Sequence, residues 1–441
     1  MKMYEQLYLL GMKHYYDNVN QAYLCMEQSL FLCDDAEDKP EIAKLRDELK
    51  SRPGFCVRPV SAVVVSYNDL EWMQVCLQSF RDTMPEGTWE MIAVDNQSSD
   101  GADEWLEKQP DVRLIRNPGN MGFSIGCNVG FSVADPGNDI LLINNDAVLT
   151  PNALFFLRMA LYESRDVGAV GAVSNYASEQ NADEEELPWN STLEETVSFS
   201  KKTNIPMSHP YEARSRLTGF AVLIARECCD QVAKAGYLLD PLFSPAYFED
   251  DDLGIRIALA GYRQLLVHNA LIYHKGGTPN QQIGAKSREK FVNKWGFDIW
   301  KYTGVMQEYE QAVKDFLAER GNKVSDDRLD GSLRVLEIDC GMGVNLAHLQ
   351  YLYPDMTVIG IEREPIISAI ASRLIRVLCG TPEEVLANVG SPDTEESYIL
   401  KSHTFDLIFA WDACSRSQDP DAMRAALRGL LKPEGRLIEI E

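Results

Sequence analysis

The chain has 441 residues, a length that suggests about three domains. Hydrophobic residues make up 45% of the sequence and charged residues 25%, so enough apolar surface exists for large cores, and wholesale disorder is excluded. Lysine and arginine total 42 against 67 aspartate and glutamate residues, which gives a formal net charge of -25. Such a surface repels phosphate backbones and anionic lipid heads, so neither nucleic acid nor a membrane surface is expected as the main partner.

Ten cysteines are spread along the chain without a CxxC pair, and most stand among apolar residues. Buried, reduced thiols are therefore expected, as is typical of a reducing cytosol. Residues 1–16 lack a long uncharged segment and a cleavage site of small residues, so no signal peptide is expected. No run reaches about 18 consecutive apolar residues, so no membrane-spanning helix is expected. We predict a cytoplasmic protein.

Residues 1–55 are expected to form a helical cap and a linker, because apolar residues recur there at three- and four-residue spacing. The spacing of Gly11, Ala22 and Leu30 resembles one degenerate tetratricopeptide hairpin. A single repeat of that kind cannot bury its own apolar face. Two interpretations stay open: a structural cap packed on the next domain, and a module that docks another protein.

From residue 56 the hydrophobic pattern changes. The run VSAVVVSY (60–67) is rich in β-branched residues, which is typical of a strand buried on both faces of a parallel sheet. Expected helices and strands then alternate as far as residue 164, which predicts an α/β fold with right-handed crossovers. Residues 174–215 lose this alternation and are polar, so a long loop or lid over a site is expected there.

Polar residues follow three of these expected strands, at the end where ligands bind in α/β folds. They are Tyr67 and Asn68 after the first strand, Asp95 and Asn96 after the second, and Asn144, Asn145 and Asp146 after the fourth. Carboxylate and amide groups at such an edge can bind a base and a ribose by hydrogen bonds. Each group alone is explained equally well by turn chemistry, but the three together indicate a nucleotide site.

Seven sequence blocks carry a resemblance to a known family. In order they are SAVVVSYN, AVDNQSSDG, RNPGNMGFSIGCNVG, ILLINNDAVLTP, LTGFAVLIAR, YFEDDDLGIRIALAGYR and IYHKGG. With this order and spacing, residues 60–277 resemble the family 2 glycosyltransferases of GT-A fold, especially the rhamnosyltransferase-like branch. The resemblance implies inverting transfer of a sugar from a nucleotide-diphosphate donor to a glycan, protein or other acceptor, assisted by Mn²⁺ or Mg²⁺.

The resemblance also implies roles for individual residues. It places the base and ribose against Tyr67, Asn68, Asp95 and Asn96. It places further parts of the donor against Asn120, Gly122, Phe123 and Asn128. The segment Asn144-Asn145-Asp146 matches the metal-binding DxD-type motif with Asn in its first acidic position, so Asp146 is expected as the main carboxylate on the cation. Gly219 is expected to permit close approach of the chain to the donor or acceptor.

Four consecutive acids run from Glu249 to Asp252. A run of acids is usually a solvated surface, but acids flanked by apolar residues indicate a buried helix start, where the helix dipole favours carboxylates. The resemblance implies that Asp250 is the catalytic base that accepts the proton of the acceptor nucleophile, with Glu249 orienting the acceptor. Asp252 and Arg256 are expected to form a structural pair, because they stand four residues apart on a helix.

His274 stands at the end of an expected strand, RQLLVHNALIYH, and is the third residue of the block IYHKGG. A lone histidine at a strand end is often a structural residue. The resemblance implies instead a ligand that completes the metal site, and both interpretations stay open.

A second α/β pattern begins at residue 331. Residues 334–441 resemble the start of a class I S-adenosylmethionine-dependent methyltransferase, with VLEIDCGMGVNL at the position of the glycine-rich turn. The resemblance implies S-adenosylmethionine bound by four residues: Glu337, Gly341, Gly343 and Glu362. Asp339 stands where such a motif usually has its first glycine, and the pattern lacks a sixth and a seventh strand. Active methylation, cofactor binding alone, and a structural or interaction role all stay open.

The expected organisation has four segments. They are a helical cap and linker (1–55), a GT-A glycosyltransferase domain (56–300), a helical connector (301–330) and a partial methyltransferase-like domain (331–441). Two alternative functions remain: a methyltransferase whose first half only positions a glycan, and a non-catalytic scaffold that binds glycans or proteins.

Overall fold

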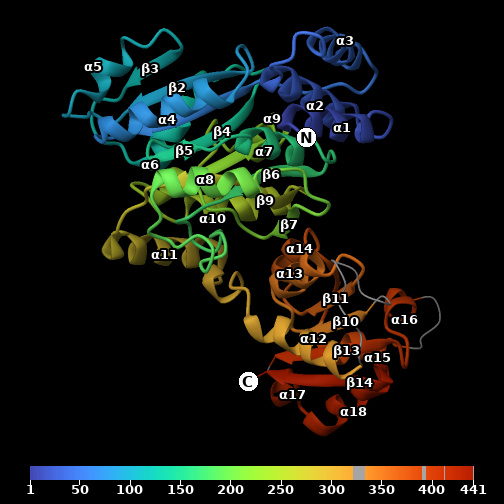
Figure 1. Ribbon diagram of the computed structural model, residues 1–441. Coiled ribbons are helices and arrows are strands. Elements are labelled where there is room, and N and C mark those ends of the chain that lie inside the picture. Colours follow the sequence, from blue (N-terminus) through green and yellow to red (C-terminus); the bar gives the residue numbers. More distant parts are fainter. Residues whose placement is uncertain (321–332, 390–393, 412, 441) are drawn as a thin grey trace. The chain divides into compact units, whose positions relative to one another are not determined.

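The computed structural model describes most of the chain (Figure 1). The described residues are 1–320, 333–389, 394–411 and 413–440. They divide into an N-terminal unit, residues 1–211 with 216–297, and a C-terminal unit, residues 298–441 with 212–215. Part of the expected connector, residues 321–330, lies outside the described residues.

Two expectations from composition can be compared with the structure. Among the described residues, no helix is long and apolar enough to cross a membrane. All ten cysteines are free thiols, and only Cys56 and Cys379 are exposed.

Three helices begin the N-terminal unit, as expected: α1 (Met3–His14), α2 (Val19–Leu32) and α3 (Lys39–Lys50). Asn18 ends the turn before α2 and caps the helix, because its side chain accepts hydrogen bonds from the N–H groups of Asn20 and Gln21. A buried ion pair between Glu27 and Arg158, at 2.6 Å, joins α2 to the following domain. These contacts favour the interpretation as a structural cap.

The strands of the N-terminal part form one mixed sheet with the order β3-β2-β1-β4-β8-β6-β9-β5. Strand β1 pairs in parallel with β2 and β4, and β2 pairs in parallel with β3. Strand β8 runs antiparallel to β4 and β6. The strands in this part of the chain are β1 (Val60–Ser66), β2 (Trp89–Asp95), β3 (Val112–Arg116), β4 (Asp139–Asn144), β5 (Ala147–Leu149), β6 (Val167–Val173), β7 (Tyr211–Arg214), β8 (Ala221–Ile224) and β9 (Arg263–His274). The parallel strands therefore bring their carboxyl ends, and the polar residues that follow them, to one edge.

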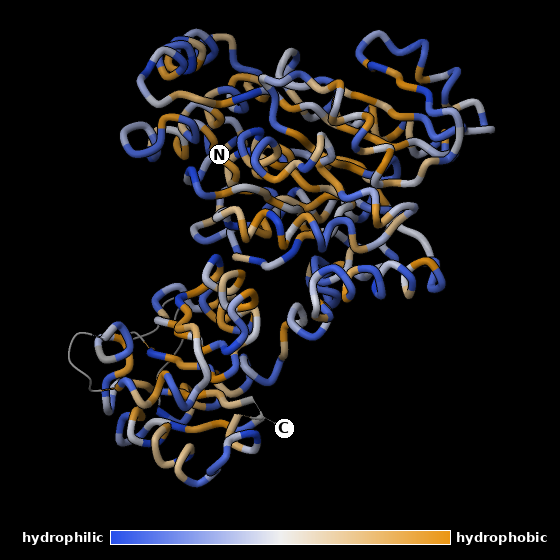
Figure 2. Tube along the Cα trace, turned by 180° about the vertical axis from the view of Figure 1, so that it is seen from behind, coloured by the Kyte–Doolittle hydropathy of each residue, from blue (hydrophilic) through white to orange (hydrophobic). Residues whose placement is uncertain are grey.

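Helices from separate parts of the sequence cover this sheet. The α-helices are α4 (Leu70–Thr83), α5 (Ala102–Leu106), α6 (Phe123–Val133), α7 (Ala153–Leu161), α8 (Leu193–Thr203), α9 (Arg226–Val232), α10 (Glu249–Leu259) and α11 (Gln281–Trp295), with a 3-10 turn η1 (Pro241–Phe243). Residues of α6, α9 and α10 bury one face of β1, β2 and β4 in a common core. Figure 2 shows hydrophobic segments of the chain concentrated in the interior of this unit.

Two features of this unit were not expected. Strand β6 has the sequence VGAVGAV, and it is buried along its whole length between β8 and β9. The segment 174–215, expected as a long loop, contains the helix α8 and the strand β7. Strand β6 was not predicted because its glycine and alanine residues have little preference for strands. The capping box of Thr192 and Glu195 is a local signal that could have identified α8.

The C-terminal unit is built on a parallel five-stranded sheet of order β12-β11-β10-β13-β14. Its strands are β10 (Arg334–Ile338), β11 (Thr357–Glu362), β12 (Arg376–Cys379), β13 (Phe405–Trp411) and β14 (Leu431–Ile440). Its helices are α12 (Gln307–Glu319), α13 (Val344–Leu352), α14 (Pro365–Ala371), α15 (Pro382–Ala387), α16 (Glu395–Ile399), α17 (Ala413–Arg416) and α18 (Pro420–Leu430), with a 3-10 turn η2 (Ile299–Lys301). A mixed α/β fold with a second, Rossmann-like sheet is thus confirmed.

Local details of this unit differ from the expectation. The apolar segment PIISAIASRLIRVL (365–378) predicts one helix, but α14 ends at Ala371. The edge of β11 offers hydrogen bonds to residues 376–379, which form β12 instead. The helix expected as a connector, α12, packs into the core of this unit through Tyr309, Val313 and Phe316.

Candidate functional site

The turns after β1 and β2 are tied together by side chains that the sequence singled out. Asn68 accepts a hydrogen bond from the N–H of Ser99 at 2.9 Å, and its own N–H donates to the Ser98 hydroxyl at 2.9 Å. Asp95 is 2% exposed and accepts from the N–H of Ser98 at 3.0 Å. Its other carboxylate oxygen is buried and has no partner among the described residues, a state that favours binding of a further donor. Tyr67 is half exposed beside this turn.

The next expected segment, residues 120–123, packs against the loop that leads to α10. The amide of Asn96 donates to the carbonyl of Gly122 at 3.2 Å, and the Asn120 side chain accepts from the Gly122 N–H at 3.0 Å. Gly122 has φ 82°, and a Cβ there would lie 2.5 Å from the Cα of Pro245. Phe123 donates its N–H to the carbonyl of Pro245 at 2.7 Å. Only glycine fits this close approach.

Asn128 and Asn145 make contacts of another kind. The Asn128 side chain is buried and forms two hydrogen bonds with the backbone of Leu239, at 2.7 and 2.9 Å, so both its polar groups hold the protein chain. Asn145 donates to the carbonyl of Asn68 at 3.3 Å and thereby joins the turn after β4 to the turn after β1.

Asp146 and His274 face one another, although they stand 128 residues apart. The Nδ1 of His274 lies 2.7 Å from the carbonyl oxygen of Tyr176, which can only accept, so the ring proton is on Nδ1. The Nε2 lone pair then points toward the Asp146 carboxylate, 3.4 Å away, and toward the Asn144 amide, 3.3 Å away. A lone pair beside a carboxylate is a suitable donor set for a cation.

These two side chains could contribute two protein ligands to a metal ion. Within residues 1–320, 333–389, 394–411 and 413–440, no group of three or more His, Cys, Asp and Glu side chains could hold a metal. Hard cations at phosphate sites commonly take one or two protein ligands and obtain the remaining oxygens from water and phosphates. Asp146 and His274 therefore fit an ion that a diphosphate helps to bind.

Sequence reasoning missed the residues that orient His274. The Asn175 side chain accepts from the N–H of His274 at 2.9 Å and donates to its carbonyl at 3.1 Å. The ring of Phe220 stacks on the imidazole, with centroids 5.0 Å apart. Asn175 and Tyr176 begin the segment that was expected as a lid, and no local pattern signals that they contact a strand about 100 residues further on.

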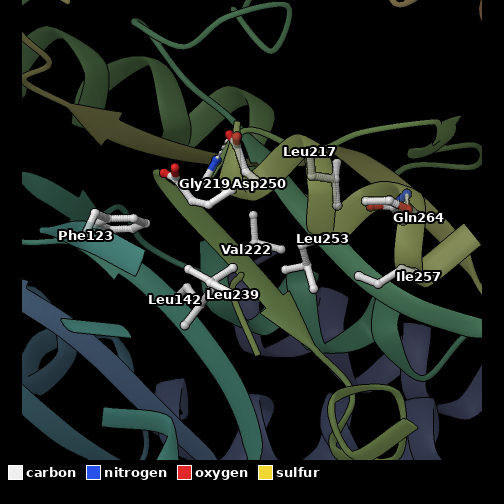
Figure 3. A pocket seen from close by; sticks show the side chains of 12 residues that line it. Phe123, Leu142, Leu217, Gly219, Val222, Leu239, Asp250, Leu253, Ile257 and Gln264 are labelled. Carbon is white, nitrogen blue, oxygen red and sulfur yellow. Dashed lines mark hydrogen bonds between the residues drawn. The ribbon is translucent and has the colours of Figure 1, made fainter. Parts of the chain in front are cut away.

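Helix α10 begins at Glu249, and its first two acids line a small cavity of about 10 Å³ (Figure 3). The Asp250 carboxylate accepts from the N–H of Gly219 at 2.9 Å and from the N–H of Asp251 at 2.9 Å. Glu249 is 7% exposed, and one of its oxygens has no partner among the described residues. Burial, reinforced by the charge of Asp250, raises the pKa of Glu249 well above its usual range.

The other two acids of the run are paired with cations. Asp251 lies 2.6 Å from the guanidinium of Arg216, which opposes the rise in the Asp251 pKa that burial causes. Asp252 is fully buried and pairs with Arg256 at 2.8 Å, which confirms the expected structural pair. Lys294 and the indole N–H of Trp295 also donate to Asp252. The run is therefore a buried helix start, as the apolar flanks indicated.

Two consecutive residues join the acids to the metal-binding side chains. Gly219 donates its N–H to Asp250, whereas the carbonyl of Phe220 accepts from the N–H of Asn144 at 2.8 Å. A Cβ on Gly219 would lie 3.4 Å from the Cβ of Asp250, an ordinary contact distance, so the expected close approach to the donor or acceptor stays a prediction. The Cα atoms of Gly219 and Phe220 are neighbours and therefore about 3.8 Å apart. Asp250, bonded to the first, and Asn144, bonded to the second, thus both lie near the start of β8.

The C-terminal unit has a separate pocket of about 620 Å³ at the ends of β10 and β11. Three of the four expected cofactor residues, Glu337, Gly341 and Glu362, line it. The Glu362 carboxylate accepts from the N–H groups of Gly341 and Glu364, each at 2.8 Å, and so shapes the glycine turn. Gly341 and Gly343 have φ of 57° and 74°, a region that favours glycine.

Asp339 and Glu337 stand in the segment where methyltransferases of this kind usually have a glycine-rich turn, and each makes a specific side-chain contact. Asp339 has φ 56°, and its carboxylate is bound by two nitrogens of Arg363 at 3.0 and 2.7 Å. The ion pair directs this side chain toward Arg363. Glu337 accepts from the Tyr309 hydroxyl at 2.5 Å, its other oxygen has no partner among the described residues, and burial raises its pKa to about 8.

Comparison with known proteins agrees with this division. Residues 61–216 match the model of glycosyl transferase family 2, and residues 306–441 match a model of a methyltransferase domain. Each matched stretch covers about a third of the chain, so the first is similar to family 2 glycosyltransferases and the second to methyltransferase domains. Asp250 and His274 lie beyond the first matched stretch.

Solved structures give partial similarities. GalNAc-T7 with UDP, GalNAc and Mn²⁺ is 15% identical with a TM-score of 0.43, over 60% of this chain and 55% of that chain. The mannosyltransferase PcManGT from Pyrobaculum calidifontis, in complex with GDP-Man and Mn²⁺, is 14% identical with a TM-score of 0.39, over 90% of each chain. S. aureus TarS is 14% identical with a TM-score of 0.37, over 53% of this chain and 40% of that chain. The chain thus spans about half the length of GalNAc-T7. No curated protein matches the sequence.

The raised pKa of Glu337 predicts a pH-dependent stability of the C-terminal unit. Because the folded state keeps this proton up to a pH of about 8 whereas an unfolded glutamate releases it near about 4.3, stability should fall between these values, on the order of 1 kcal/mol per pH unit at most. Calorimetry of the full chain from pH 5 to 9 measures this fall. Glu337→Gln should flatten it, and the exposed control Asp421→Asn should not. Parallel curves for wild type and Glu337→Gln would contradict the assignment.

Proposed function

We propose that the glycosyltransferase domain is an inverting, metal-dependent enzyme that moves a sugar from a nucleotide-diphosphate donor to a glycan, protein or other acceptor. The observation that carries the proposal is the pair of residues Gly219 and Phe220. Gly219 donates a hydrogen bond to Asp250 of α10, and Phe220 stacks on His274, which faces Asp146. An inverting transfer needs a base near the anomeric carbon and a cation at the departing diphosphate.

Donor binding is assigned to the ends of the parallel strands. Tyr67, Asn68, Asp95 and Asn96 would bind the base and ribose, and the unpartnered oxygen of Asp95 supports this role. Segment 120–123 would bound the donor, since the bonds of Gly122 and Phe123 to the Pro245 loop fix its position. Asn128 would act indirectly, through the backbone of Leu239.

Asp146 and His274 would hold Mn²⁺ or Mg²⁺, with Asn144 beside them. Such an ion, when bound, offsets the negative charge that gathers on the departing diphosphate. Asn175 and the Tyr176 carbonyl keep the lone pair of His274 directed toward Asp146.

Asp250 would accept the proton of the acceptor nucleophile. Two backbone N–H groups fix its carboxylate, which limits the freedom lost when an acceptor binds. Glu249 lies beside Asp250 and would help to orient the acceptor through its unpartnered oxygen.

The replacement Asp250→Asn keeps the shape of the side chain and removes the base. Transfer should fall at least about 100-fold, because general-base catalysis typically supplies that factor or more. A thermal-shift screen of nucleotide sugars with Mn²⁺ identifies the donor, and radiolabelled transfer measures turnover. The control Asp230→Asn alters an exposed acid of α9 and should leave turnover unchanged. Undiminished turnover in Asp250→Asn would refute the role of Asp250, and donor affinity should survive in this variant.

A second function is proposed for the C-terminal unit, on the observation of its pocket at the ends of β10 and β11. Here S-adenosylmethionine would bind with its ribose hydroxyls on Glu362. The turn that contains Gly341 and Gly343 would let the backbone approach the cofactor closely. Glu337 would release the proton that its burial favours and bind the ammonium group of the cofactor through its unpartnered oxygen, because a nearby cation favours the carboxylate. Methyl transfer to a glycan or glycosylated acceptor remains the alternative activity of this unit.

Calorimetric titration of the full chain with S-adenosylmethionine tests this second function. Glu362→Ala should weaken binding about tenfold or more, because it removes a charged acceptor of the ribose hydroxyls. The control Asp421→Ala, on the exposed side of α18, should bind like the wild type. A wild-type chain that takes up no cofactor would leave this unit a structural or interaction role.

A cytoplasmic location and protein docking through the N-terminal helices stay predictions.

A further inference from the structure

Lys275 follows His274 and lies between the turn after β1 and the metal-binding side chains. Its backbone N–H donates to the carbonyl of Asp146 at 3.1 Å. Its ammonium donates to the carboxylate of Asp69 at 3.0 Å, one residue beyond Asn68. The side chain of Lys275 therefore extends from the proposed cation site to the proposed nucleoside site.

A stack of aromatic rings supports the stem of Lys275. Its ammonium lies 5.4 Å from the ring centroid of Trp72. Trp72 in turn stacks on Tyr273, with centroids 5.5 Å apart and ring planes at 19°. The ammonium is thus held at one place without being buried.

The ion pair with Asp69 is open to exchange. The Lys275 side chain is 36% exposed and the Asp69 side chain 51% exposed, so water and salt screen their attraction. A diphosphate carries more charge than one carboxylate and offers several oxygen acceptors. It would therefore compete well with Asp69 for the ammonium.

We propose that Lys275 exchanges Asp69 for the diphosphate of the donor and stabilises it as leaving group. The inference rests on the proposed function, because that function sets the path of the donor. A nucleoside at Asn68 and Asp95 and a cation at Asp146 require the diphosphate to pass between them. Asn145 spans the same interval by its bond to Asn68, so the distance is short. Lys275 contacts both ends of it.

The charge of the site gives this ammonium its role. Asp69, Asp95, Asp146 and Asp250 surround the path of the donor, and the whole chain has a net charge of -25. When the bond between the sugar and the diphosphate breaks, its electron pair stays on the phosphate oxygen, while the acceptor proton passes to Asp250. The ammonium offsets the added negative charge and keeps its own protons.

Two variants separate this role from a purely structural ion pair. Lys275→Met removes the ammonium and retains an apolar stem over Trp72. Asp69→Asn removes the same ion pair but leaves the ammonium free, and asparagine tolerates the left-handed φ of 60° at this position. Thermal melting of both variants checks that each is folded.

The experiment is calorimetric titration of the full chain with Mn²⁺ and the diphosphates and monophosphates of uridine, guanosine, adenosine and thymidine. Lys275→Met should weaken the best diphosphate about tenfold or more and affect the monophosphate less. Asp69→Asn should bind the diphosphate as tightly as the wild type, or more tightly. Raised salt should weaken diphosphate binding less in Lys275→Met than in the wild type.

Three results would overturn the proposal in distinguishable ways. Unchanged diphosphate binding in Lys275→Met would show that the ammonium does not bind phosphate, while the proposed function stands. Equal losses in Lys275→Met and Asp69→Asn would show that only the ion pair matters. A wild-type chain that binds none of the nucleotides would remove the proposed function and this role together.

Discussion

The site depends on two hydrogen bonds made by consecutive residues. The N–H of Gly219 donates to the Asp250 carboxylate, and the carbonyl of Phe220 accepts from the N–H of Asn144. Strand β8 begins immediately afterwards, inserted antiparallel beside β4 in an otherwise parallel part of the sheet. This insertion brings residues from four distant parts of the sequence to one place. Without it, the proposed base and the proposed metal-binding side chains would have no common anchor.

Charge pairing then decides which acids are available for chemistry. In the first turn of α10, Asp251 and Asp252 are neutralised by Arg216 and by Arg256 with Lys294. Asp250 is held by backbone N–H groups alone, and Glu249 is buried beside it. The helix start thus separates two structural acids from two acids that face the pocket. In a protein with a net charge of -25, a cation beside a bound diphosphate offsets unfavourable repulsion, which is the role proposed for Lys275 and for the metal ion.

The sequence predicted those parts of the fold and site that have local signals. Strand β1 was expected from its β-branched run, and β2 and β4 from the alternation of expected strands and helices. The polar residues after them do meet at one edge. Asn18 and the Asp252–Arg256 pair also follow from short-range rules. Asn175, Tyr176 and Arg216 could not be predicted, because each acts on a partner 35 to 99 residues away that only the folded chain brings near. β6 was missed since alanine and glycine carry little strand preference, and β12 since its pairing with β11 overrides a helical pattern.

The most direct test of the account is an anomalous-scattering measurement on crystals soaked with Mn²⁺ and a nucleoside diphosphate. The account predicts one strong manganese peak bonded to the Asp146 carboxylate and to Nε2 of His274, with the diphosphate on the same ion and Asp250 free of metal. A peak on the acids of α10, or manganese bound away from both Asp146 and His274, would contradict it.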